Sequence, residues 1–261
     1  MNLRKVAEMT SSNPIALVTG GSRGLGRNMA QKLAQDGTDV IFTYHSNSVE
    51  AQSLVAEIEA MGRRAAALQL DAGKSGTFDA FAKAIGDVLG QWQCTRFNFL
   101  VNNAGMGVHA GFAETTEAQF DDLMNVHLKG TFFLTQKLLP LLADGGRIIN
   151  ISSGLTRFSN PGFAAYATMK GAIEVLSRYM AKELGPRGIG VNVVAPGAIE
   201  TDFGGGVVRD NPEFNAMIAG QTALGRVGMP DDIGGVVASL LRPANGWING
   251  QRIEVSGGVS L

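Results

Sequence analysis

Seven short apolar runs, most of them rich in Val, Ile and Leu, alternate along this chain with stretches of helical periodicity. Most of the runs are continuously apolar rather than alternating, as expected of parallel strands covered on both faces. This alternation of apolar runs and helical stretches predicts a doubly wound α/β fold, with one seven-stranded parallel sheet and helices on both of its faces. The runs cover residues 15–19, 39–44, 66–70, 97–103, 147–152, 188–196 and 251–258.

Between the runs, apolar residues recur at helical spacing, as Met29, Ala30, Leu33 and Ala34 do within residues 26–37. Further helices are expected at about residues 49–61, 76–89 and 117–142, and from about Tyr166 onward.

No internal repeat, low-complexity tract or Pro/Ser-rich linker divides the chain. We therefore expect a flexible N-terminal tail over residues 1–13 and one domain over residues 14–261. The segment 204–220 opens with three glycines between the sixth run and the helix that follows it. It predicts a mobile substrate lid over about residues 203–220.

Composition excludes several classes of function. The chain has 22 basic and 23 acidic residues, a net charge of −1, and no long run of either sign, which argues against a nucleic-acid partner. No run reaches the roughly 18 apolar residues of a membrane span, and the N-terminus lacks the apolar stretch of a secretion signal. The single cysteine, Cys94, needs no oxidising compartment, so we expect a cytoplasmic protein with no membrane partner. The three histidines, His45, His109 and His127, are scattered, and no metal site is expected.

A glycine-rich turn follows the first run and opens the first helix, with the sequence Thr-Gly-Gly-Ser-Arg-Gly-Leu-Gly over residues 19–26. Glycines allow backbone N–H groups to approach a pyrophosphate, which a helix N-terminus then holds. The alternative is a tight strand-to-helix connection with no ligand. The position of the glycine-rich turn at the start of the strand–helix series favours a dinucleotide site.

Three further motifs occur in order along the chain. Residues 102–105 read Asn-Asn-Ala-Gly, Tyr166 and Lys170 form Tyr-x-x-x-Lys, and residues 196–201 read Pro-Gly-Ala-Ile-Glu-Thr. With the glycine turn, they resemble the motifs of the short-chain dehydrogenase/reductase family, and especially its 3-oxoacyl-[acyl-carrier-protein] reductase-like members. The resemblance covers about residues 15–258. It implies a Rossmann fold, a nicotinamide cofactor and a homotetramer.

The charge at the end of the second run bears on the choice of cofactor. A carboxylate there reads the ribose 2′-hydroxyl of NAD, whereas the 2′-phosphate of NADP needs a cation. Residues 44–47 are Tyr-His-Ser-Asn and contain no acid, while Arg23 in the glycine turn can reach the same space. We therefore expect NADP(H) to be preferred, with NAD(H) possible. The alternative is that Arg23 is a solvated turn residue.

Asp71, just after the third run, matches the position from which this family contacts the adenine ring. It could also cap the following helix, because Asp is favoured at that position. From the glycine turn, the charge at the end of the second run and the family resemblance, cofactor binding is expected at Gly20, Ser22, Arg23, Gly24, Leu25, Gly26, His45, Ser46, Asp71, Ala72, Asn103, Ala104, Gly105, Tyr166, Lys170, Pro196, Gly197, Ile199 and Thr201.

Tyr166 and Lys170 are four residues apart, so on a helix they share a face. A neighbouring ammonium group favours an ionised phenol, and we expect Lys170 to lower the pKa of Tyr166. By the resemblance, Ser153 polarises the substrate oxygen, Tyr166 transfers the proton, and Asn125 positions a water molecule behind Lys170. Asn125 could instead be a polar residue bonded within its helix. Ser152 is expected to point away from the site.

These residues predict an NAD(P)(H)-dependent oxidoreductase that transfers a hydride between nicotinamide and a small-molecule carbonyl or secondary alcohol. A ketone reductase of 3-oxoacyl type is the leading hypothesis. The alternative is a non-catalytic, dinucleotide-binding regulatory relative, which would be free to lose Tyr166 or Lys170.

Overall fold

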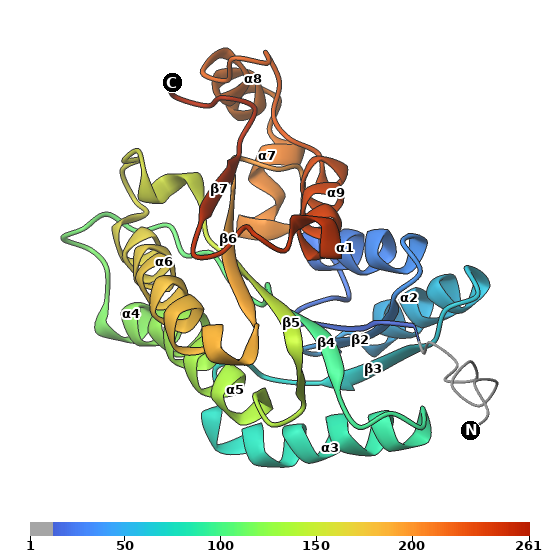
Figure 1. Ribbon diagram of the computed structural model, residues 1–261. Coiled ribbons are helices and arrows are strands. Elements are labelled where there is room, and N and C mark those ends of the chain that lie inside the picture. The colour runs from blue at the N-terminus through green and yellow to red at the C-terminus, as the bar shows by residue number, and fades with distance from the viewer. Residues whose placement is uncertain (1–12) are drawn as a thin grey trace, which may run out of the picture.

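A single parallel sheet of seven strands forms the centre of the computed structural model, which describes residues 13–261 (Figure 1). The strand order is β3-β2-β1-β4-β5-β6-β7. The expected fold class and all seven expected strands are confirmed. The tail expected over residues 1–13 lies, apart from Asn13, outside the described residues. The strands are β1 (Ile15–Val18), β2 (Asp39–Tyr44), β3 (Ala65–Gln69), β4 (Phe97–Asn102), β5 (Leu142–Ile151), β6 (Gly190–Pro196) and β7 (Arg252–Val255).

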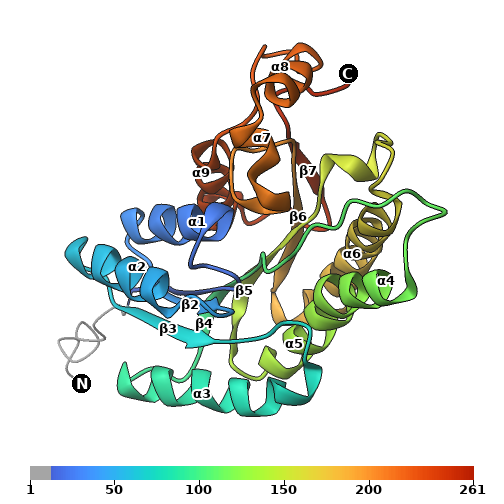
Figure 2. The same cartoon turned by 180° about the vertical axis from the view of Figure 1, so that it is seen from behind.

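Helices cover both faces of the sheet, as Figure 1 and the reverse view in Figure 2 show. One face carries α1 (Gly24–Gln35), α2 (Ser48–Ala60) and α9 (Pro230–Leu241), and the other carries α3 (Phe78–Gln91), α5 (Thr131–Leu138) and α6 (Ala164–Glu183). Short 3₁₀ turns connect some of these elements: η1 (Ser75–Thr77), η3 (Gly154–Thr156), η4 (Gly185–Arg187) and η6 (Pro243–Asn245).

Successive residues of each strand pack into two separate hydrophobic cores, one on each face of the sheet. Val18 and Phe42 are buried on the α1–α2–α9 side, while their neighbours Leu17 and Ile41 are buried on the α3–α5–α6 side. The side chains of a strand point alternately to its two faces, so a strand covered on both sides must be apolar throughout. This is why the strands are continuous apolar runs in the sequence.

The helix expected over residues 117–142 is divided into three parts. It consists of α4 (Glu117–Leu123), the π-helical stretch η2 (Met124–Gly130) and α5, which ends at Leu138, so the expected end at residue 142 is wrong. Pro140 cannot donate a backbone hydrogen bond, and Leu142 already pairs with Phe97 of β4. In η2, Gly130 packs against the carbonyl oxygen of Ala72, where a side chain would not fit.

The segment expected to form a lid is mostly helical. It contains η5 (Phe203–Gly206), α7 (Val207–Asp210) and α8 (Pro212–Gly220), beyond the end of β6 and close to the C-terminus (Figure 1). Among residues 13–261, no helix has the length and hydropathy needed to cross a membrane.

The order of the strands reverses at β1, which has β2 on one side and β4 on the other. In open α/β sheets, ligands bind in the crevice at the carboxyl ends of the strands on either side of such a reversal. The expected site residues follow β1, β2, β3, β4, β5 and β6, so the topology brings them to this edge.

Candidate active site

The turn between β1 and α1 has the shape of an anion cradle. Gly20 has a φ of +64°, in the left-handed region that favours glycine, and a side chain on Gly26 would overlap the carbonyl oxygen of Gly20. The first turn of α1 has neither a capping side chain nor an acidic residue. Its N–H groups are therefore available to a bound anion, and the residues present fit a pyrophosphate.

Asn103 and Thr19 brace this turn from the end of β4. The Nδ2 of Asn103 donates to the carbonyl oxygens of Thr19 (2.9 Å) and Gly20 (3.2 Å). The backbone N–H groups of Asn103 and Ala104 donate to Oγ1 of Thr19, each at 2.9 Å. The Asn103 side chain, expected among the cofactor ligands, is thus engaged in holding the shape of the turn.

Asp71 lies at the end of β3 with two basic side chains beside it. Its Oδ1 accepts a hydrogen bond from the N–H of Gly73 at 3.0 Å, and its Oδ2 is 3.2 Å from Nζ of Lys74 and 3.6 Å from Nε2 of His45. Burial acts to raise the pKa of Asp71, but these partners together hold it below its usual value. The helix-cap alternative is wrong, because the Asp71 side chain bonds within its own turn and Thr77 is the residue that precedes α3.

Two arginines near the glycine turn differ in how their side chains are used. The guanidinium of Arg27 binds Ser53 (3.2 Å) and pairs with Glu57. The exposed side chain of Arg23 has no hydrogen bond or ion pair with any residue from 13 to 261. Ser46 is also exposed at the end of β2. The Arg23 guanidinium is therefore available to pair with a phosphate bound in this region.

Ser153, Tyr166 and Lys170 meet where β5 ends and α6 begins. Lys170 is only 5% exposed, and its Nζ donates to the carbonyl oxygen of Ile151 at 2.8 Å. The same Nζ lies 5.6 Å from the centre of the Tyr166 ring. Ser153 is near enough to Tyr166 for its hydroxyl to act on the phenol by hydrogen bonding. The three residues are thus brought together as the sequence predicts.

The pKa values of this group differ from the expectation for Tyr166. Burial raises the pKa of the Tyr166 phenol above its ordinary value, and the opposing effect of the Ser153 hydroxyl is smaller. Burial also lowers the pKa of Lys170 to about 8. The net pKa of Tyr166 is thus raised rather than lowered as expected, because the desolvation of the buried phenol dominates. Tyr166 is a neutral phenol at neutral pH.

His127, for which the sequence predicts no role, is the residue of η2 that lies against Tyr166. It is 1% exposed, and its ring meets the Tyr166 ring edge-to-face with the centres 5.3 Å apart. Burial, and next the charge of Lys170, lower the pKa of His127 to about 3. Asn125, expected behind Lys170, makes no side-chain hydrogen bond to Lys170 or Tyr166 in the part of the chain that the structure describes.

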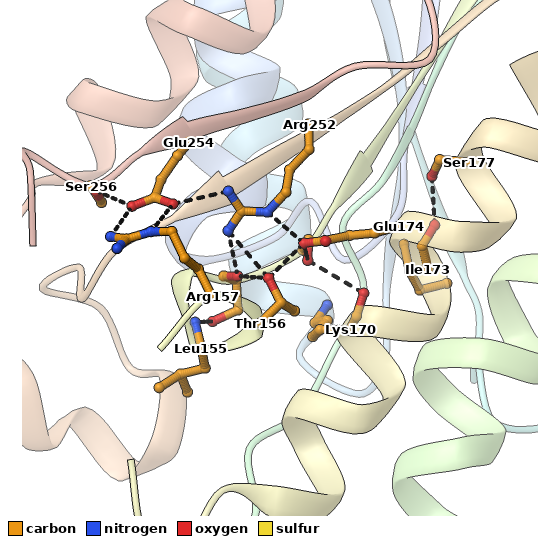
Figure 3. A network of polar contacts seen from close by, with 12 residues as sticks. Leu155, Thr156, Arg157, Lys170, Ile173, Glu174, Ser177, Arg252, Glu254 and Ser256 are labelled. Atoms are coloured by element: carbon orange, nitrogen blue, oxygen red, sulfur yellow. Dashed lines mark hydrogen bonds and ion pairs between the residues drawn. The ribbon is translucent and has the colours of Figure 1, made fainter. Parts of the chain in front are cut away.

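A network of ionic and polar groups holds the segment that carries Ser153 (Figure 3). One carboxylate oxygen of Glu174 accepts hydrogen bonds from Ser152 (2.7 Å), Thr156 (2.7 Å) and Arg252 (2.8 Å). Arg252 also donates to the carbonyl oxygen of Ser153 at 3.3 Å. Ser152 therefore faces this network rather than Tyr166, as expected.

The segment after β6 contacts both the glycine turn and Tyr166. Thr201 is buried against Gly24 of the glycine turn, and its Oγ1 accepts a hydrogen bond from the N–H of Phe203 at 3.2 Å. The Phe203 ring packs on Gly107 and stands 5.8 Å from the Tyr166 ring. The remaining expected residues, Ser22, Leu25, Ala72, Gly105, Pro196, Gly197 and Ile199, lie in the same turns and strand ends.

Comparisons with known proteins cover nearly the whole chain. A protein-family model described as "Enoyl-(Acyl carrier protein) reductase" matches residues 20–260. The 3-oxoacyl-[acyl-carrier-protein] reductase FabG of Staphylococcus aureus is 36% identical over 256 residues, which cover 97% of this chain and 100% of that protein.

Solved structures of similar proteins also match nearly the whole chain. The promiscuous reductase LugOII, which catalyses keto-reduction at C1 during lugdunomycin biosynthesis, is 40% identical, with a TM-score of 0.91 over 96% of this chain and 99% of that chain. A short chain dehydrogenase from Burkholderia cenocepacia, in complex with NADP, is 35% identical, with a TM-score of 0.86 over 94% of this chain and 97% of that chain.

Proposed function

This chain belongs to the short-chain dehydrogenase/reductase family and is an NAD(P)-dependent oxidoreductase, and we propose that it reduces a 3-oxoacyl-type ketone with NADPH. The observation that carries the proposal is the buried, neutral phenol of Tyr166 beside Ser153 and Lys170. A regulatory protein that only binds a dinucleotide has no need of a buried lysine, which must be desolvated to stand there. That alternative is not favoured.

The preference for NADPH rests on Arg23 and on the lack of a carboxylate at the end of β2. The uncommitted guanidinium of Arg23 offers a charge-assisted partner for a 2′-phosphate. The relative from Burkholderia cenocepacia was solved with NADP, which agrees with this assignment. The pyrophosphate would lie on the glycine turn at Gly20 and Gly26, and Lys170 would hold the nicotinamide ribose.

The bound cofactor supplies the hydride, and the chain's own residues handle the proton. The Ser153 hydroxyl donates a hydrogen bond to the substrate carbonyl oxygen, and the Tyr166 phenol gives its proton to the same oxygen. Because burial keeps Tyr166 protonated, the phenol is ready to act as the acid in the direction of reduction. The Lys170 ammonium group then stabilises the phenolate that remains.

Aromatic or cyclic ketones are a second candidate substrate class. Phe203 lies 5.8 Å from Tyr166, and Phe163, three residues before Tyr166, packs edge-to-face on His109 with the centres 5.0 Å apart. Such rings favour a flat substrate by offset or edge-to-face contact. The reductase LugOII, which acts during lugdunomycin biosynthesis, is a relative of this chain.

Oxidation of NADPH with a panel of substrates tests the proposal. We expect turnover of a 3-oxoacyl thioester, with a 2-tetralone as the aromatic arm and a trans-2-enoyl thioester as the control for carbon–carbon double-bond reduction. Faster reduction of the tetralone would favour the second candidate. Turnover of the enoyl thioester alone would overturn ketone reduction altogether.

We also propose a homotetramer in the cytoplasm. Phe132 and Phe133 of α5 are each about 40% exposed, and Val175 and Tyr179, one turn apart on α6, are also exposed. Apolar side chains at such spacing form patches that favour association with further copies. Light scattering at micromolar concentration should give four times the mass of the chain, and a monomer would contradict the tetramer.

A further inference from the structure

The segment that follows β7 fastens the turn that comes after α8. We call this segment, residues 256–260, the strap. The N–H groups of Ala223 and Leu224 donate to carbonyl oxygens of the strap at 3.2 and 3.1 Å, and the N–H of Ser260 donates in the opposite direction at 2.9 Å. Val259, in the middle of this pairing, is only 3% exposed. The strap therefore holds the residues after α8 in a short antiparallel pairing.

The two ends of the lid segment, residues 203–220, are held differently. It opens with the three glycines at 204–206, all of which have φ between +62° and +79°. A side chain on either of the first two would meet no atom of residues 13–261 within 4 Å beyond its chain neighbours. Past the other end, a side chain on Gly258 of the strap would come within 2.9 Å of Cβ of Ala223. The backbone can therefore rotate where the lid segment begins, whereas the turn after the lid segment is packed closely against the strap.

Arg157 holds the strap from the loop that carries Ser153. The guanidinium of Arg157 donates to the carbonyl oxygens of Val259 (2.6 Å) and Ser260 (3.0 Å). It also forms a bidentate ion pair with Glu254 of β7, with N–O distances of 2.8 and 2.7 Å (Figure 3). Arg157 stands four residues after Ser153, at the end of η3. One side chain thus joins the loop after β5 to β7 and to the strap.

Only an arginine can make this set of contacts. Its planar guanidinium carries five N–H donors, and the four hydrogen bonds of Arg157 use Nε and both Nη atoms. The hydrogen bonds from Arg157 also lower the pKa of Glu254 to about 2, so the pair stays charged across the neutral range. A lysine at this position could pair with Glu254 but could not hold the two carbonyl oxygens at the same time.

We propose that Arg157 is a positioning residue for substrate binding: it fixes the strap, and through the strap it fixes the C-terminal end of the lid segment. Movement of the lid segment is then confined to the three glycines at 204–206. Phe203, directly before them, stands 5.8 Å from the Tyr166 ring, so the position of the lid segment sets the room left for a ketone beside Tyr166. In this role Arg157 acts through the strap rather than on the reacting atoms. The effect on the substrate rests on the proposed function, but the hold of Arg157 on the strap does not.

Amide hydrogen exchange of the full-length protein tests the strap without any assay of activity. In Arg157→Gln, the amides of Ala223, Leu224 and Ser260 should exchange about tenfold faster, because their hydrogen bonds depend on a strap that has lost its contacts with the guanidinium. Arg96→Gln is the matched control, since Arg96 is an exposed arginine at the opposite end of β4, and it should leave these amides unchanged. Unchanged exchange in Arg157→Gln, or equal acceleration in every strand of the sheet, would overturn the proposal.

Steady-state kinetics separate this role from a loss of stability. Arg157→Gln should raise the KM for a 3-oxoacyl thioester about tenfold, with little change in kcat or in the Kd of NADPH, because substrate binding is weakened and the chemical step is not. A variant that is only less stable has a smaller folded fraction, which lowers kcat and leaves KM as it was. Arg157→Lys keeps a partner for Glu254 and should give a smaller rise in KM. A lowered kcat with an unchanged KM would overturn the proposal.

The unaltered protein supplies a second measurement, which decides if Arg157→Gln does not fold. Its amides at 204–206 should exchange faster than those of Ala223 and Leu224, because only the latter two are held by the strap. The reverse order would overturn the proposal. If the unaltered protein reduces no ketone, the proposed function fails, while hydrogen exchange continues to test the hold of Arg157 on the strap by itself.

Discussion

The ammonium group of Lys170 is joined to the backbone carbonyl oxygen of Ile151 by a hydrogen bond of 2.8 Å. Ile151 is the last residue of β5, so this bond fixes α6 to the end of the strand that leads into Ser153. It satisfies one donor of a charge that is almost fully buried, and burying a charge without partners is costly. The charge state of Lys170 should therefore depend on pH near neutrality.

We expect kcat/KM for ketone reduction to fall above about pH 8, because burial lowers the pKa of Lys170 to about 8 and the uncharged amine cannot stabilise a phenolate. The pKa of Tyr166 is raised, so Tyr166 remains protonated over the same range. A pH profile of kcat/KM measures this. A rate that stays constant to about pH 10 would remove the charge of Lys170 from the mechanism.

The lowered pKa of Lys170 also makes the free energy of unfolding depend on pH. The pKa of Lys170 is about 8 in the folded protein and 10.5 in its ordinary state, so the unfolded chain binds more protons between these values. The contribution of Lys170 to the free energy of unfolding therefore rises with pH through this window. Denaturant unfolding of the unaltered protein against Lys170→Met should give a difference in that direction, and a difference that falls with pH would contradict the burial of the charge.

Glu174→Gln should destabilise the protein by about 1–3 kcal/mol, because Arg252 loses the carboxylate on which Ser152 and Thr156 also converge. We expect kcat to fall as well, with little change in the Kd of NADPH, since Arg252 and Thr156 both hold the carbonyl oxygen of Ser153. Urea unfolding and steady-state kinetics check both effects. Glu183→Gln, at an exposed position on the same helix, is the control and should change neither quantity.

The sequence was sufficient to predict the sheet and the grouping of Ser153, Tyr166 and Lys170, since both depend on local patterns. The continuous apolar runs mark the strands, and the Tyr166–Lys170 spacing places both side chains on one helix face. The glycine turn likewise follows directly from residues 19–26.

The features that the sequence could not predict depend on contacts between distant segments. Glu174 and Arg252 are 78 positions apart, and nothing in either neighbourhood suggests that they pair. His127 looked like one of three scattered histidines, and its partners lie on another loop at Gly105 and Met106. The π-helical turn of η2, which interrupts the expected helix, also has no signal in the apolar periodicity. The raised pKa of Tyr166 comes from tertiary burial, which spacing does not reveal.

We expect the cofactor preference to depend on the charges at positions 23 and 45. His45→Asp should move the ratio of kcat/KM values for NADPH and NADH toward NADH by roughly tenfold to a hundredfold, because it places a carboxylate where the 2′-phosphate would bind. Arg23→Ala should act in the same direction by weakening NADPH alone.

Arg27→Ala is the matched control for Arg23→Ala, since the Arg27 guanidinium is engaged by Glu57 and Ser53. We expect Arg27→Ala to lower stability and leave the cofactor ratio unchanged. If the unaltered protein already uses NADH better than NADPH, Arg23 does not select NADPH and the missing carboxylate does not disfavour NADH.

Tyr166 is proposed to deliver the proton to the substrate oxygen, and Tyr166→Phe isolates this step. The substitution removes only the hydroxyl and keeps the ring that contacts His127 and Phe203. The measurement is the turnover of a 3-oxoacyl thioester with NADPH, together with the Kd of NADPH from fluorescence titration. We expect an unchanged Kd and a kcat that falls by about 10²- to 10⁴-fold, the usual contribution of general acid catalysis. Near-normal turnover with intact NADPH binding would contradict this role of Tyr166.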